Sequence, residues 1–294
     1  MILLTGATGL VGSTLLRRLT ARPEPVRCLI RDPRRLGDQR VRVQIALGDL
    51  TDPQSFRHAM RGVRTVIHLA ASVRDQPRGS IEELNGVATW RMVHAAERAG
   101  VERFVFFSAM SASTFSRARF FRAKALAEQA VSASEVPHTV FAPSIIYSPG
   151  DPFLTLLNRL ALLLPVMPVA GDGSAIYHPI WADDVADCIM AVLDDAGDKG
   201  SARYELAGPD TLSYEAIVRL ALRSFGRRRL IVHVPMPLVN RFLRLAKLVA
   251  GNAVFATWDE VELMAVPMTS PKGTADAERL GVQPRPMRAV LGVG

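Results

Sequence analysis

TGATGLVGSTLLRRL, residues 5–19, joins a short apolar run at 2–5 to a helical pattern. Its glycines are Gly6, Gly9 and Gly12. A turn of this kind that binds a dinucleotide needs the first glycine for its backbone torsions, the second so that the chain can approach a pyrophosphate, and the third for close packing of helix on strand. The helix N-terminus then offers free N–H groups and a partial positive charge to the phosphates. The stretch predicts a dinucleotide-binding turn rather than a plain strand–turn–helix.

The first half of the chain continues as apolar runs that alternate with helical patterns. The runs are rich in Val, Ile and Phe and nearly continuous, as in parallel strands that are buried on both faces. This alternation predicts an α/β fold, in which residues 1–150 form a Rossmann-type, doubly wound parallel sheet. We expect strands at 2–5, 26–30, 41–48, 64–70, 103–108 and 138–143, and helices at 10–21, 53–60, 81–99 and 117–134.

Proline and glycine punctuate the chain after Ser148, and strands and helices no longer alternate regularly. We therefore expect a smaller, mostly helical lobe on the substrate side, formed by 151–181 and 203–294. The helical pattern at 182–194 is expected to return to the sheet. In 237–251, apolar residues recur at helical spacing among basic ones. That pattern favours a lobe helix over the pocket, with a helix for a membrane surface or a partner as the alternative.

The end of the second expected strand bears on the choice of cofactor. A domain that prefers NAD usually carries an acidic residue there, which holds the ribose hydroxyls. This chain has Arg31 at the strand end and Asp32 just beyond it. A guanidinium can clamp a 2′-phosphate and stack on adenine, whereas Asp32 could serve NAD if Arg31 is merely exposed. The pattern favours NADP(H) over NAD(H).

The 294-residue chain carries a formal charge of +8 and has a pI near 10.2. No zinc finger, basic zipper or RNA-binding signature accompanies its arginines, so nucleic acid is not expected as a partner. The two cysteines, Cys28 and Cys188, have no other metal-ligating residues at ligand spacing. They predict buried thiols in a reducing compartment and no metal site.

The start of the chain, MILLTG, lacks the basic region and cleavage site of a signal peptide. The most apolar stretch, 153–170, contains an asparagine, an arginine and two prolines, and is a poor bilayer span. A cytoplasmic location is therefore expected, with contact to a membrane surface left open.

Besides the glycine turn, six further stretches of the sequence match the motifs of a known protein family. They are GDLTD (48–52), VIHLAA (66–71), FVFFSAMS (104–111), FFRAKALAEQAV (120–131), FAPSIIYSPGD (141–151) and WADDVA (181–186). In this order, over about residues 1–210, the chain resembles the atypical and extended short-chain dehydrogenase/reductases, the group of NAD-dependent epimerase/dehydratases. Two later stretches, 204–222 and 258–284, look like the branch of the NDUFA-nine-type accessory subunit of respiratory complex I.

The resemblance implies roles for particular residues. Asp49 and Leu50 would lie beside the adenine, and Ser108 would end the strand that reaches the nicotinamide. Lys124 would bond the nicotinamide ribose. His68, in mid-strand, is expected to be a satisfied core histidine without a catalytic role. The residues expected to contact the dinucleotide are Gly6, Thr8, Gly9, Leu10, Val11, Gly12, Arg31, Asp49, Leu50, Leu69, Ala70, Ala71, Ser108, Lys124, Pro143 and Ser144.

The chain differs from this family at the positions of the general acid/base. Active members have a tyrosine four residues before the lysine, and its phenolate is favoured by the nearby ammonium. That position is Phe120 here, and a second expected hydroxyl position is Met110. The first tyrosine of the chain is Tyr147, a less favoured candidate for the acid/base. Both usual proton-handling groups are therefore missing.

Three functions remain open from the sequence. The favoured one is a cofactor-binding protein that uses NADP(H) as a structural or redox-sensing ligand. The second is an NADP(H)-dependent reductase or nucleotide-sugar epimerase, acting on a small molecule with a non-standard proton donor. The third is an assembly or scaffold protein whose C-terminal lobe docks a protein partner or a membrane complex.

Overall fold

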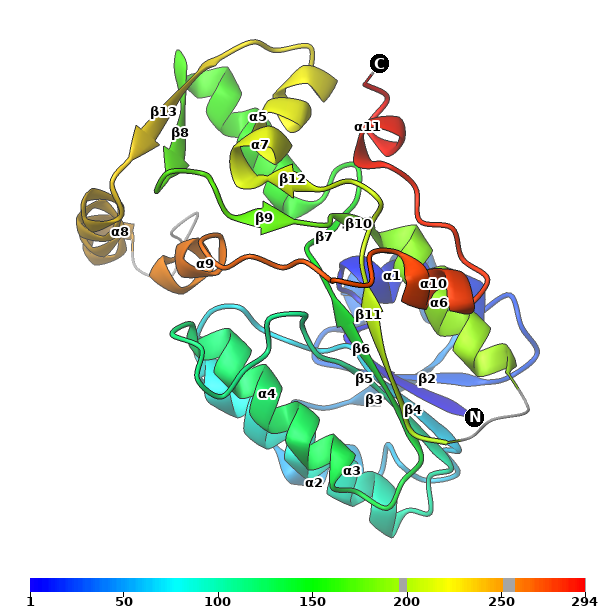
Figure 1. The fold of residues 1–294 in the computed structure, drawn as a ribbon. Helices are drawn as coiled ribbons and strands as arrows, with labels where there is room; N and C mark the ends of the chain where they lie inside the picture. The colour runs from blue at the N-terminus through cyan, green and yellow to red at the C-terminus, as the bar shows by residue number, and fades with distance from the viewer. Residues whose placement is uncertain (196–199, 251–256, 294) are drawn as a thin grey trace.

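The computed structural model describes residues 1–195, 200–250 and 257–293. Its centre is a seven-stranded parallel sheet of order β11-β6-β5-β4-β1-β2-β3 (Figure 1). The strands are β1 (Ile2–Thr5), β2 (Val26–Ile30), β3 (Gln44–Leu47), β4 (Thr65–His68), β5 (Arg103–Phe107), β6 (His138–Pro143) and β11 (Ala202–Leu206). The reversal of order at β1 is that of a doubly wound sheet, so the predicted fold class is confirmed.

Helices cover both faces of the sheet (Figure 1). The first face carries α1 (Leu10–Leu19) and α6 (Ala182–Asp194). The second carries α2 (Pro53–Arg57), α3 (Ala88–Arg98) and α4 (Arg119–Ser132). Within β1, Ile2 and Leu4 belong to the first core and Leu3 to the second. Because successive strand side chains point to opposite faces, a strand buried on both sides needs the unbroken apolar run seen in the sequence.

Most of the expected helices and strands are a few residues shorter, and two contain another conformation. The strand expected at 41–48 is only Gln44–Leu47, because a 3₁₀ helix, η1 (Pro33–Arg42), precedes it. The helix expected at 81–99 begins with a π-helical turn, η2 (Glu83–Val87), and continues as α3. β3 is an edge strand with mostly exposed residues. Its length is therefore weakly marked by apolar residues.

Residues 202–206, most of which we expected in the lobe, complete the sheet instead. β11 pairs in parallel with β6, and α10 (Ala275–Arg279) packs against β11. The carboxylate of Asp276 accepts a hydrogen bond from the N–H of Glu205 at 2.9 Å. The predicted boundary at 203 is therefore wrong for this strand, which is amphipathic because it lies at the edge of the sheet.

The remaining segments form the smaller lobe above the sheet (Figure 1). Its apolar core joins α5, α7 and β8, with Leu157, Met167 and Ile217 among the buried residues. The helices are α5 (Pro152–Leu163), α7 (Tyr214–Ser224), α8 (Met236–Ala250), α9 (Trp258–Leu263) and α11 (Met287–Val290). The short strands pair as β7 (Ile146–Tyr147) with β10 (Ile180–Trp181), β9 (Ile176–Tyr177) with β12 (Leu212–Ser213), and β8 (Val166–Ala170) with β13 (Leu230–Val234).

The C-terminal segment around residues 285–287 contacts both the lobe and a helix that packs on the sheet. Arg285 donates from Nε and Nη2 to Asp184 of α6 at 3.0 and 2.8 Å, and its guanidinium lies 3.7 Å from the ring centroid of Trp181. Two residues later the N–H of Met287 donates to Asp210 of the lobe. Across the described part of the chain, no helix is both long and apolar enough to cross a membrane.

Candidate functional site

The glycine turn lies between β1 and α1 at the carboxyl edge of the sheet. Gly6 has φ +72°, and a Cβ on it would lie 2.6 Å from the amide nitrogen of Ala70. A Cβ on Gly12 would lie 2.0 Å from the carbonyl oxygen of Gly6. Both contacts are with backbone, so neither position has room for a side chain. Gly9 is the N-cap of α1, and no side chain caps the helix there, which leaves its first N–H groups for an anion.

A cavity of about 640 Å³ opens beside this turn. That volume lies in the range of small-molecule and cofactor sites. Nine of the expected contact residues line it: Gly6, Thr8, Gly9, Arg31, Asp49, Leu50, Leu69, Ala70 and Ala71. These residues come from four different strand ends, which the parallel sheet brings to one edge.

The other expected contacts do not line this cavity. Leu10, Val11 and Gly12 form the first turn of α1, immediately next to it. Ser108, Lys124, Pro143 and Ser144 lie farther along the sheet, at the ends of β5 and β6 and on α4. Their contact with a cofactor stays a prediction.

Two arginines and an aspartate surround the end of β2. Arg31, Asp32 and Arg35 all line the cavity. The carboxylate of Asp32 accepts the N–H of Arg34 at 3.0 Å and thereby caps η1. Oδ1 of Asp32 is thus engaged with the backbone of η1, whereas Arg31 and Arg35 have no hydrogen-bond partner for their guanidinium groups among the described residues. Arg35 was missed as a site residue, although the run RDPRR (31–35) was visible in the sequence.

The hydrogen bonds of the Asp49 carboxylate indicate whether the cavity suits an adenine. Its Oδ1 accepts from the N–H and the hydroxyl of Thr51 at 3.1 and 3.0 Å. Its Oδ2 is buried and has no hydrogen-bond partner among the described residues. A buried carboxylate oxygen without a donor is costly, and the exocyclic amine of an adenine is a donor of the right kind. The cavity therefore fits the adenine end of a dinucleotide.

A chain of hydrogen bonds connects Thr5, which directly precedes the glycine turn, to His68 and Thr89. Thr5 Oγ1 lies 2.8 Å from His68 Nδ1, and His68 Nε2 lies 3.0 Å from Thr89 Oγ1. Thr89 donates to the carbonyl of Asn85, so its oxygen accepts from His68 Nε2–H. The neutral imidazole is then the acceptor for Thr5. As expected, His68 is a satisfied core histidine.

Because the His68 imidazole is buried and neutral, we expect the folding stability of the protein to decrease in acid. Burial, with nearby Lys124, lowers the pKa of His68 from its ordinary value of 6.5 to about 3. Between these values the unfolded chain binds a proton that the folded chain excludes, so stability falls as the pH falls below 6.5, by up to about 1.4 kcal/mol per pH unit. Urea denaturation from neutral pH to about pH 5 should show a shallower pH slope for His68→Gln than for the unaltered protein. Equal slopes would contradict a neutral, buried His68.

Lys124 is buried in α4 and points toward β5. Its Nζ donates to the carbonyl of Phe107 at 2.5 Å, and it lies 5.8 Å from the ring centroid of Phe120. Burial lowers the pKa of Lys124 to about 7, and Glu128 opposes the shift only in part. The ammonium therefore faces a phenyl ring where a phenol was expected. This ring has no proton to give.

The hydroxyl of Ser108 is also engaged. It donates to the carboxylate of Glu128, which accepts from Arg203 of β11 at 2.7 Å as well. Tyr147 is buried in the lobe core, and its hydroxyl has no partner among the described residues. Burial, with Asp184 and Asp210, raises the pKa of Tyr147. Such a phenol is a poor source of phenolate.

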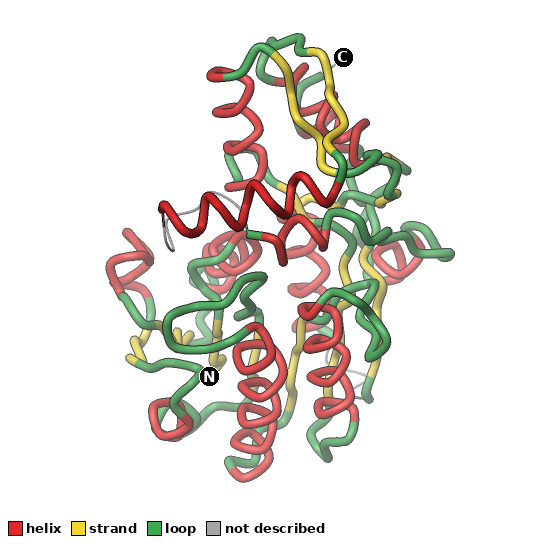
Figure 2. The backbone as a smooth tube through the Cα atoms, turned by 90° about the vertical axis from the view of Figure 1, so that its left-hand side faces the viewer, coloured by secondary structure: helices red, strands yellow, loops and turns green. Residues whose placement is uncertain are grey.

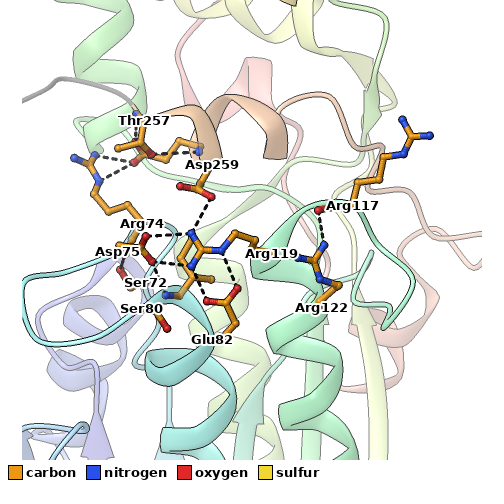
Figure 3. A network of polar contacts seen from close by, with 12 residues as sticks. Ser72, Arg74, Asp75, Ser80, Glu82, Arg117, Arg119, Arg122, Thr257 and Asp259 are labelled. Carbon is orange, nitrogen blue, oxygen red and sulfur yellow. Dashed lines mark hydrogen bonds and ion pairs between the residues drawn. The ribbon is translucent and has the colours of Figure 1, made fainter. Parts of the chain in front are cut away.

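A cluster of ion pairs joins the N-terminus of α4 to the lobe (Figure 3). Arg119 contacts the carboxylates of Glu82, Asp75 and Asp259 at 2.6, 3.1 and 3.5 Å. Arg119 lowers the pKa of Glu82 to about 2. Because Asp259 belongs to α9, this cluster fixes that helix over α4, next to Phe120.

The loop after β4 takes part in both the cavity and the lobe. Ser72 and Gln76 line the cavity. Between them, Arg74 donates to Glu260 of α9 at 2.7 Å (Figure 3). Glu260 also forms a capping box with Thr257 at the start of α9. The loop at 72–76 therefore lies between the cavity and α9, a contact that no motif in the sequence indicated.

The family model described as NAD(P)H-binding matches residues 6–196, from the glycine turn through α6. The chain belongs to the NAD(P)H-binding family. The match contains every strand of the sheet except β1 and β11. Dinucleotide binding and membership of the atypical short-chain dehydrogenase/reductase group are thereby confirmed.

Proteins similar to this chain differ in what they do. The chain is 28% identical to the mitochondrial NADH dehydrogenase [ubiquinone] 1 alpha subcomplex subunit 9 of Arabidopsis thaliana, over 80% of this chain and 60% of that protein. It is also 28% identical to a ceramide reductase of Caulobacter vibrioides, over 81% of this chain and 74% of that protein. The chain thus spans less than two thirds of the length of the plant subunit.

Solved structures agree on the fold. A nucleoside-diphosphate-sugar epimerase (SAV0421) from Staphylococcus aureus superposes with a TM-score of 0.77, over 99% of each chain, at 20% identity. At that identity the likeness supports the Rossmann-type architecture with its lobe and says nothing of the substrate.

Proposed function

We propose that this NAD(P)H-binding protein holds NADP(H) as a structural or redox-sensing ligand and does not catalyse ordinary alcohol or ketone redox. The observation that carries the proposal is Phe120, whose ring stands beside Lys124 where the acid/base would be. Ser108, already engaged with Glu128, and Met110 offer no replacement. When bound, the cofactor supplies a nicotinamide that can give or take a hydride. This chain's residues then bind and orient it without moving a proton.

The residues around the cavity support retention of a dinucleotide. The uncapped N-terminus of α1 suits the pyrophosphate, and Asp49 Oδ2 suits the adenine amine. Lys124 would contribute to the nicotinamide ribose, since its ribose contact serves binding as well as chemistry. The other expected contacts, Pro143 and Ser144, would flank the ring.

Preference for NADP(H) over NAD(H) is supported by the wall at the end of β2. Arg31 and Arg35 both face the cavity, and two guanidinium groups match the charge of a 2′-phosphate. Asp32, the residue that would hold the ribose hydroxyls of NAD, has one carboxylate oxygen, Oδ1, engaged in capping η1.

The test is a search for turnover. The unaltered protein, loaded with NADPH or NADP⁺, should give only background change in nicotinamide absorbance with common alcohols, ketones and nucleotide sugars. General acid–base assistance contributes about 10²–10⁴ in rate, so its loss slows redox severely without abolishing binding. Lys124→Ala should weaken NADPH binding. Lys124→Met fills the same space without the amine and should weaken it equally. Robust turnover would overturn the proposal, and Tyr147 would be the first residue to substitute.

An enzyme with a non-standard donor is the second candidate. The pKa of Lys124, lowered to about 7 by burial, suits proton transfer near neutral pH. The similarity to a ceramide reductase fits the same candidate. Under this alternative, the turnover search finds a substrate that Lys124→Met does not convert.

A scaffold role for the lobe is the third candidate. The plant relative is described as a subunit of NADH dehydrogenase, which fits a chain that docks a larger assembly. Under this proposal the protein is cytoplasmic and peripheral to a membrane, or held by a protein partner through the lobe. Leu238 and Leu245 on α8 are more than half exposed, which favours an apolar contact there.

A further inference from the structure

The net positive charge of the chain comes from two segments. Residues 152–171 and 216–258 contain nine arginines and lysines and no aspartate or glutamate. The remainder of the chain carries 27 basic residues against all 28 acidic ones. The whole excess of +8 therefore belongs to these segments, which build the outer part of the lobe.

The same segments expose large apolar side chains. Leu163, at the end of α5, is 80% exposed, and Leu230, at the start of β13, is 77% exposed. These two positions are neighbours, because Arg229 donates from Nε to the carbonyls of Ala161 and Leu164. Apolar side chains so exposed on neighbouring elements mark a contact surface rather than a core.

α8 extends this surface (Figure 2). In Figure 2 the helix crosses the side of the lobe that faces the viewer, and the strand pair β8–β13 rises above it. Leu238, Arg241 and Leu245 are exposed and share one helix face by their spacing. We call the exposed residues of the end of α5, of β13 and of α8 the basic leucine face.

Three acidic residues close to this face are held in ion pairs, and a fourth, Asp172 near His233, accepts the N–H of Ser174 at 3.0 Å. Glu215 pairs with Arg219 and with His233 of β13. In α9, which packs against α8, Asp259 and Glu260 contact Arg119 and Arg74 of the sheet domain. The charge of the three paired residues is therefore neutralised locally and does not offset the arginines of the face.

We propose that the basic leucine face binds the surface of a bilayer that contains anionic phospholipids. The exposed leucines of this face suit the acyl chains of a lipid layer, and the exposed Arg241 and Arg244 of α8 suit its phosphate groups. A nucleic acid would match the arginines but leave the leucines in water. The inference goes beyond the dinucleotide site and does not depend on it.

Vesicle co-sedimentation tests this proposal on the full chain. Binding to vesicles of phosphatidylcholine with phosphatidylglycerol should be strong, and binding to phosphatidylcholine alone weak. Each basic residue near an anionic surface contributes about a fivefold change in affinity, so Arg241→Gln with Arg244→Gln should weaken binding roughly 30-fold. Leu230→Ser should weaken it by about tenfold.

Matched changes on the sheet domain serve as controls. Arg40→Gln with Arg42→Gln removes the same charge from exposed positions of η1, and Leu47→Ser changes an exposed leucine on the edge strand β3. These controls should bind vesicles nearly as the unaltered protein does, and all variants should keep their NADPH affinity. The proposal is overturned if neither vesicle binds, if both bind equally, or if controls and test variants lose equally.

Discussion

Replacing Gly12 by alanine should destabilise the protein by at least about 3 kcal/mol and lower NADPH affinity by at least about a hundredfold. The new Cβ would lie 2.0 Å from the carbonyl oxygen of Gly6 and 3.0 Å from the Cα of Ala7. Both neighbours are backbone, so α1 and the turn must separate. The separation moves Gly6 and Gly9, which line the cavity. Urea denaturation and NADPH titration measure the two losses.

Gly86→Ala is the matched control. Gly86 lies in the π-helical turn before α3, and a Cβ there would meet its nearest atom, the carbonyl oxygen of Ala123, at an ordinary 3.6 Å. Alanine at a helical position without a clash should stabilise by about 0.5–1 kcal/mol. The two alanine substitutions therefore have opposite signs. A Gly12→Ala protein as stable as the Gly86→Ala protein would refute the close approach at the turn.

Arg31→Ala should lower the affinity for NADPH by roughly ten- to a hundredfold and leave the affinity for NADH almost unchanged. The reason is the loss of a charge-assisted contact, on the order of 1.5–3 kcal/mol, which only a 2′-phosphate can make. Calorimetric titration with both nucleotides measures the difference. Equal losses for NADPH and NADH would mean that Arg31 contacts a part they share.

Arg34→Ala controls for charge. Arg34 is exposed in the same basic run but does not line the cavity. Its substitution should change either affinity by less than about threefold, since a screened surface charge contributes little. Arg35→Ala, by contrast, should weaken NADPH binding selectively, as Arg31→Ala does.

The central strands were predictable because burial on both faces leaves a continuous apolar run. β1, β2 and β6 have the bounds expected from the sequence. The two edge strands were not predictable in the same way. β3 is largely exposed, and β11 alternates polar residues such as Arg203 and Glu205 that bind side chains from α4 and the C-terminal segment. Edge strands lack the apolar signal of their neighbours, so their pairing depends on contacts distant in the sequence.

The site residues could be predicted at positions where the backbone geometry allows only one residue type. Only glycine fits at 6 and 12, so the turn could be recognised from spacing. The side chains of Asp32 and Ser108 could not be placed in this way, because their partners, the N–H of Arg34 and the carboxylate of Glu128, depend on local folding. The same holds for Gln76, which lines the cavity from a loop without any motif.

The loop at 72–76 contacts both the cavity and the lobe. Ser72 and Gln76 border the cavity, while Arg74 and Asp75 are held by ion pairs that reach α9 or α4. Reciprocity then applies: whatever free energy a docked α9 adds to ligand affinity through this loop, the ligand returns to the docking of α9. A ligand whose affinity depends on this loop would therefore also stabilise the docked position of α9, and loss of the Arg74–Glu260 ion pair would weaken binding of that ligand.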